Sequence, residues 1–136
     1  LEPLARWLRG VGRTRTGPEL AAALLELTMF ERRTIARFAP FDAVLSPALA
    51  MTPRPIGWYD ADDGEENFAQ QVRYTPFTSF VNVAGLPAVT VPTHRTDSGL
   101  PMGVQLIGRP GGEAAILTLA TMLQRRMRVA SPSLPE

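Results

Sequence analysis

Few side chains in this sequence are suited to acid–base or nucleophilic chemistry. The chain has no Cys and no Lys, its 14 basic residues are all Arg, and its single imidazole belongs to His94. Asp97 and Ser98 follow closely and complete the residue types of a Ser–His–Asp triad. Neighbours in one surface turn rarely converge as a triad requires, so we expect His94 to be a solvated histidine. A small α/β enzyme that uses His94 and nearby acids is the alternative.

The missing residue types exclude several kinds of site. Without Cys the chain forms no disulfide, thiolate nucleophile or zinc–thiolate centre. Arg cannot replace Lys as a proton acceptor, because the guanidinium group stays protonated near neutral pH. The side chains of this sequence therefore include no amine that could act as a base.

Two stretches are similar to ligand-binding loops. The acid run D-A-D-D-G-E-E (60–66) looks like the start of a calcium loop, but Gln71 stands where an EF-hand needs an acid. The stretch G-R-P-G-G (108–112) precedes an expected helix, whose N-terminus could receive an anion, but no G-K-[ST] follows it and Glu113 would repel phosphate. We interpret the first as a solvated loop that caps the next helix and the second as a strand-to-helix turn. We expect no metal and no cofactor.

Composition restricts the partners further. The chain has 136 residues, of which 45% are hydrophobic, so it is long and apolar enough for one globular domain. Its net charge is +1 and no basic stripe carries interleaved aromatics, so we expect no nucleic-acid partner. The apolar runs are too short to cross a bilayer, so we expect no membrane partner. With no Cys in the chain, a reducing cytoplasm is the expected location.

Helices are expected on both sides of a central region. A short helix covers 1–9, and Gly and Pro make 10–18 a loop. Thr16 lies near the N-cap of the next helix, with Pro18 and Glu19 in its first turn, and Pro40 ends it. A last helix covers 113–127, with an apolar stripe and Arg in its final turn.

The central region is expected to hold strands at 41–48, 87–92 and 102–108. Asp97-Ser98-Gly99 predicts an antiparallel hairpin between the last two. We expect a loop at 51–67, a helical turn or two at 66–73, and a short helix over 75–85 that ends at Gly85. The strands lack alternation, which indicates burial on both faces in an α/β fold. Because three strands make a thin core for this length, a larger parent sheet is expected.

Three segments in order resemble the C-terminal part of the amidase signature family. They are F-D-A-V-L-S-P-A-L-A-M-T-P-R-P-I-G (41–57), F-V-N-V-A-G-L-P-A-V-T-V-P (80–92) and D-S-G-L-P-M-G-V-Q-L-I-G-R-P-G-G-E-A-A-I-L-T-L-A (97–120). The family form of the third begins D-G-L-P, so Ser98 is one extra residue in a turn that tolerates it. The resemblance spans about 40–124 of the chain.

The resemblance implies an α/β fold that is part of a large mixed sheet flanked by helices. It makes 1–136 one C-terminal segment: helical over 1–39, strands and loops over 40–110, and a C-terminal helix over 111–128. It also implies amide hydrolysis by a Ser–cis-Ser–Lys triad located in the N-terminal and central parts of family members. This chain has neither the Lys nor the Gly/Ser-rich segment, so we expect it to be inactive alone and to need the N-terminal part of a parent amidase. A stand-alone scaffold or binding module is the alternative.

For substrate contact the resemblance gives four residues: Trp58, Thr75, Thr78 and Asn82. Trp58 and the adjacent Tyr59 are candidates to line an acyl pocket, or to pack against the missing half of the parent. In members that deamidate glutamine on transfer RNA, an acid stands seven residues before the position of Asn82, where this chain has Thr75. Small neutral or apolar amides are therefore the expected substrates, and 6-aminohexanoate amides are compatible. We also expect self-association through apolar faces that the parent would cover.

Overall fold

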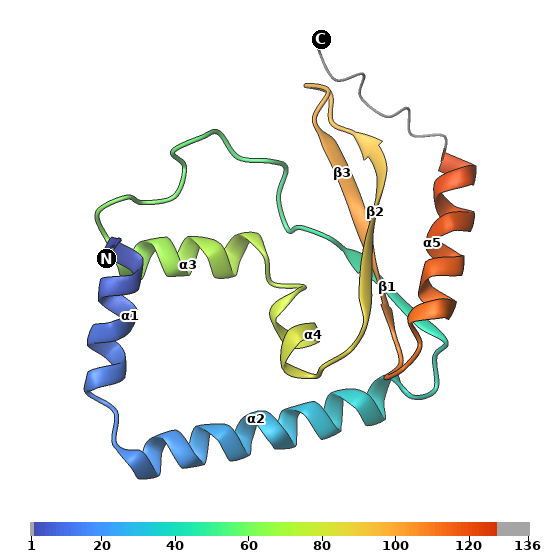
Figure 1. The fold of residues 1–136 in the computed structure, drawn as a ribbon. Coiled ribbons are helices and arrows are strands. Elements are labelled where there is room, and N and C mark those ends of the chain that lie inside the picture. The colour runs from blue at the N-terminus through green and yellow to red at the C-terminus, as the bar shows by residue number, and fades with distance from the viewer. Residues whose placement is uncertain (1, 128–136) are drawn as a thin grey trace.

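The computed structural model describes residues 2–127, which form a small sheet with helices on both faces and a separate helical frame (Figure 1). The sheet has the order β1-β3-β2, and both outer strands run antiparallel to β3. Its strands are β1 (Ala43–Pro47), β2 (Ala88–Arg95) and β3 (Pro101–Gly108). The expected hairpin is confirmed: β2 and β3 are joined by a turn in which the Thr96 N–H donates to the Leu100 carbonyl at 2.8 Å.

Helices cover the two faces of the sheet unequally. On one face, α5 (Glu113–Met127) places Ile116 and Ala120 against Val91 and Leu106. On the other, α4 (Ser79–Val83) and the turn after it pack against Ile107, which is 1% exposed. Burial on both faces is therefore observed for the second half of β3 but not for the outer strands. The expectation for β1 was wrong, since Leu45 remains 62% exposed because α5 lies over β2 and β3.

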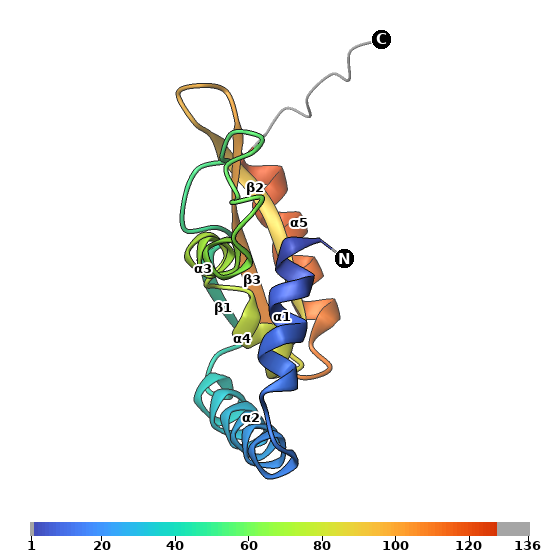
Figure 2. The same ribbon diagram turned by 90° about the vertical axis from the view of Figure 1, so that its left-hand side faces the viewer.

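The helical frame is formed by α1 (Pro3–Arg13), α2 (Gly17–Phe38) and α3 (Gly64–Tyr74). Figures 1 and 2 show α2 extending away from the sheet, so that only its C-terminal end approaches α4, where Ile35 and Phe38 meet the core. At the other end of the helical frame, α1 packs against α3. There the backbones approach so closely that a Cβ on Gly64 would lie 2.6 Å from the Trp7 Cβ, so glycine is required.

Local capping signals place the helix ends. Thr16 is the N-cap of α2, as expected, and it also forms a capping box with Glu19. Hydrogen bonds from Thr16 hold the pKa of the exposed Glu19 carboxyl below its ordinary value. Gly85, at φ 59°, follows α4 and lets the Leu86 N–H donate back to the Val81 carbonyl at 3.1 Å, which is a Schellman ending.

Three expected boundaries were wrong. The first helix continues to Arg13 instead of ending at residue 9, because glycines in an exposed helix cost only about 1 kcal/mol each and do not break it. The loop expected to 67 ends earlier, because Asp63 caps α3. The helix expected over 75–85 is limited to 79–83, since the residue before Pro76 is driven out of the helical region and Thr75 ends α3 instead. No helix within residues 2–127 is long and apolar enough to cross a membrane.

Candidate functional site

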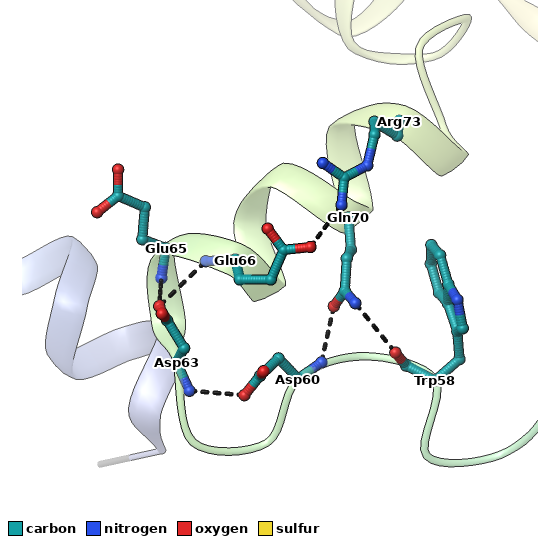
Figure 3. Close-up of polar contacts among 7 residues, drawn as sticks. All are labelled: Trp58, Asp60, Asp63, Glu65, Glu66, Gln70 and Arg73. Atoms are coloured by element: carbon teal, nitrogen blue, oxygen red, sulfur yellow. Dashed lines mark hydrogen bonds and ion pairs between the residues drawn. The ribbon is translucent and has the colours of Figure 1, made fainter.

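The Gln70 side chain of α3 bonds the proline-rich loop between β1 and α3 on both sides of Tyr59 (Figure 3). The Asp60 N–H donates to Gln70 Oε1 at 2.7 Å, and Gln70 Nε2 donates to the Trp58 carbonyl at 3.2 Å. A single amide therefore satisfies one backbone donor and one backbone acceptor, as a neighbouring strand would. The loop residues on either side of Tyr59 are held at a fixed distance from the helix.

Asp60 is the centre of a second set of contacts. Its carboxylate accepts the N–H groups of Asp62 and Asp63 at 2.9 and 2.7 Å, and its carbonyl accepts from Asn67 Nδ2 at 2.6 Å. Hydrogen bonds from the Asp63 and Asp62 backbone hold the pKa of the Asp60 carboxyl below its ordinary value, because they stabilise the charged form. The carboxylate thus shapes the turn that leads into α3.

The rest of the acid run begins the helix. The Asp63 carboxylate accepts the N–H groups of Glu65 and Glu66 at 2.9 and 3.1 Å, which makes it an N-cap, and Glu66 pairs with Arg73 on the next turns (Figure 3). The interpretation of this run as a capping loop is confirmed. Across residues 2–127, no three His, Cys, Asp or Glu side chains are grouped as metal ligands.

Three aromatic rings gather where this loop meets the end of α3. The Trp58 ring lies 5.1 Å from that of Tyr59 and 6.0 Å from that of Tyr74, measured between centroids, and Tyr59 and Tyr74 are 6.3 Å apart. The Arg54 guanidinium sits 5.1 Å from the Trp58 centroid, in cation–π range. These contacts define an aromatic wall of Trp58, Tyr59 and Tyr74, and Trp58 itself is half-buried.

The other predicted binding residues lie on the segment that follows Tyr74. Thr75 Oγ1 donates to the Gln71 carbonyl at 2.9 Å and Thr78 Oγ1 donates to the Thr75 carbonyl at 3.1 Å, so both hydroxyls already have local acceptors. Asn82 is exposed on α4, and its backbone N–H donates to the Thr78 carbonyl. The structure thus brings Thr75, Thr78 and Asn82 onto one segment, and Trp58 adjoins it through Tyr74. Substrate contact by these four residues stays a prediction.

Two further residues that position this site were not found from the sequence. Gln105 is 4% exposed in the middle of β3, and its Nε2 donates to the Phe77 carbonyl at 2.9 Å and to Ser46 Oγ at 3.3 Å. It therefore ties the 75–78 turn to the sheet. A polar residue inside G-V-Q-L-I-G was a signal for it, because a buried amide needs partners. Gln70, by contrast, lies on a polar helix where nothing in the sequence distinguishes it from Gln71.

The remaining candidates are His94, Ser98 and the stretch 108–112, and their contacts belong to local turns and strand ends. His94 is exposed near the end of β2 opposite Met102, and Thr93 Oγ1 lies 3.4 Å from its Nδ1. Ser98 Oγ is 2.8 Å from Thr96 Oγ1, within the hairpin turn, so Ser98 and His94 have different side-chain partners. The stretch 108–112 is a strand-to-helix turn, as expected, closed by the Gly112 N–H donating to the Arg109 carbonyl at 2.8 Å.

Comparison with known proteins shows which family this chain is similar to. The amidase family matches residues 5–117. AmiC of Mycobacterium tuberculosis, an amidase-class protein, is 29% identical over 120 residues, which cover 86% of this chain and 25% of AmiC. Fatty acid amide hydrolase of Oryza sativa subsp. japonica is 37% identical over 87 residues, covering 64% of this chain and 14% of that protein.

Among solved structures, that of 6-aminohexanoate cyclic dimer hydrolase complexed with substrate superposes with a TM-score of 0.83. It is 23% identical, and the superposition covers 93% of this chain and 28% of the other, so it establishes the fold. The predicted partial amidase signature fold is thereby confirmed. This chain spans about a quarter of the length of AmiC, and with a family match over residues 5–117 it belongs to the amidase family.

Proposed function

We propose that this chain is the C-terminal part of an amidase signature hydrolase that cleaves carboxamide bonds of small molecules. The observation that carries the proposal is that the match over residues 5–117 falls on a chain with no Lys side chain. Amide hydrolysis in the form the resemblance implies needs that amine as a base, and Arg cannot supply it. The catalytic residues therefore lie in another part of the enzyme, and this part is inactive alone.

The role of this part is scaffold and one wall of the acyl pocket. The aromatic wall provides an apolar surface, and the adjoining segment adds the neutral side chains of Thr75, Thr78 and Asn82. Apart from Arg54, which packs on the Trp58 ring, these side chains are uncharged, and they favour neutral or apolar acyl groups because an unpaired charge is costly to desolvate. Thr75 in place of an acid points away from glutamine carried on transfer RNA.

The partner of this chain is the N-terminal part of the same amidase, in the cytoplasm. Support comes from α2, none of whose 22 residues is buried although Leu20, Leu24, Leu25 and Leu27 lie along it. A helix that is apolar on more than one side is normally buried by neighbours. Figure 1 shows only its C-terminal end approaching the sheet, so the remaining length is available to the N-terminal part.

The test is amide hydrolysis by the 136-residue chain alone and by the same chain joined to its N-terminal part. We expect turnover only in the joined enzyme. The control is His94→Ala, which should leave the joined enzyme's kcat/KM unchanged because His94 is exposed on the hairpin. Enzyme-like turnover by the purified chain alone would overturn the proposal. Loss of that turnover in the His94→Ala variant of the chain alone would identify catalysis by His94 instead. If the joined enzyme shows no amidase activity, the alternative holds that the chain is a scaffold or binding module.

A further inference from the structure

The loop before Tyr59 is bonded to α3 at its start, where the Ala50 N–H donates to the Tyr74 carbonyl at 3.1 Å, and next at Trp58, through Gln70. Of the hydrogen bonds within residues 2–127, the only backbone–backbone one from residues 51–59 joins the Trp58 N–H to the Pro55 carbonyl at 3.1 Å, inside the loop itself. The loop also contains Gly57 at φ 83°, a position with high backbone freedom when unfolded. Among the described residues 51–59, hydrogen bonding of the backbone to α3 therefore depends on Gln70, while the Trp58 ring also packs against Tyr74.

After Tyr59 the chain is held independently. The Asp60 carboxylate and the Asn67 amide fix the turn into α3. The Asp63 carboxylate caps that helix (Figure 3). Removal of the Gln70 amide would therefore leave α3 and its cap in place. The backbone of Trp58 would be released while the residues beyond Asp60 kept their contacts.

We propose that Gln70 is a positioning residue for substrate binding: its amide holds the Trp58 and Asp60 backbone so that the aromatic wall keeps one orientation toward the acyl group. This inference rests on the proposed function, in which Trp58 faces the substrate. Gln70 itself acts through the loop and touches no reacting atom. The physical effect is pre-organisation, because a loop that samples several positions binds only in the fraction of molecules that have the right one.

The expected size follows from the contacts that are lost. Gln70→Met keeps the length and helix propensity of the side chain but removes both hydrogen bonds. Two hydrogen bonds of ordinary net strength change the equilibrium constant between the ordered and the released loop by about thirtyfold. Because KM scales with the inverse of the ordered fraction, which cannot exceed one in the wild type, KM rises by a factor of up to about thirty while kcat changes less than about twofold.

The experiment uses the joined enzyme and follows steady-state kinetics and amide hydrogen exchange. Gln70→Met should raise KM as above and accelerate exchange of the Asp60 N–H by at least about tenfold, since its acceptor is gone. The Leu86 N–H, bonded to Val81 beside the core, serves as the internal reference and should not change. Trp58→Leu should raise KM comparably, and Gln124→Met, an exposed glutamine of α5, is the matched control with wild-type kinetics.

Each other outcome overturns the inference. If KM is unchanged in Gln70→Met although Trp58→Leu raises it, the loop does not depend on Gln70. If neither variant alters KM, the aromatic wall does not face the substrate. If Leu86 exchange accelerates together with Asp60 exchange, the role of Gln70 is general stability. A wild-type joined enzyme without activity toward amides would instead refute the proposed function, and Asp60 exchange would still decide whether Gln70 holds the loop.

Discussion

A substitution at Leu45 tests whether further polypeptide covers the sheet of this chain in the whole enzyme. It lies in β1 opposite Leu106, yet it is 62% exposed while Leu106 is buried beneath α5. Replacing a fully buried Leu by Ala costs about 2–5 kcal/mol. Because only about two-fifths of Leu45 is buried in this chain, Leu45→Ala should lower the free energy of unfolding of the chain alone by about 1 kcal/mol.

In the joined amidase the same substitution should cost about 3 kcal/mol, because the N-terminal part would cover β1. Ile107→Ala is the matched control: Ile107 is 1% exposed already, so its cost should be about 3 kcal/mol in both settings. Urea unfolding followed by circular dichroism measures both values, with unchanged slopes as the condition for comparison. Equal costs of Leu45→Ala in the two settings would refute the reasoning that this face is covered.

Two further predictions concern charge and association. Asp60 has a pKa below its ordinary value in the folded chain, so its contribution to stability is present above the unfolded pKa and is lost as pH falls through the folded one. As the pH falls, the proton resonances of the Asp62 and Asp63 amides should therefore shift with a midpoint below 3.8. Asp60→Asn should abolish that titration. A midpoint at the ordinary pKa of an Asp side chain would contradict the prediction. The chain alone should self-associate through α2 and the edge of β1, because both present unpaired apolar surface. Sedimentation velocity should show mass rising with concentration; a compact monomer that binds no apolar dye would count against it.

Local chemistry made much of the fold predictable. Thr16 with Glu19, Gly85 after α4, and the Asp97-Ser98-Gly99 turn act through bonds to neighbours a few residues away, so their effects can be read from the sequence. The same holds for Asp63 at the start of α3. The family motifs were equally direct, since they are strings of residues. Substrate contact by Trp58, Thr75, Thr78 and Asn82 stays a prediction.

What only the tertiary structure decided is which polar groups meet across long separations. Gln105 bonds Phe77, 28 residues away, and Gln70 holds the backbone of Trp58, 12 residues away. No local pattern encodes either contact, because the partners are backbone carbonyls that every residue carries. Their selection depends on how α3, β3 and the loops pack, and that same packing leaves Leu45 and α2 exposed. The sequence by itself therefore determined the elements and the family, while the positions of the site residues were decided by packing between distant segments.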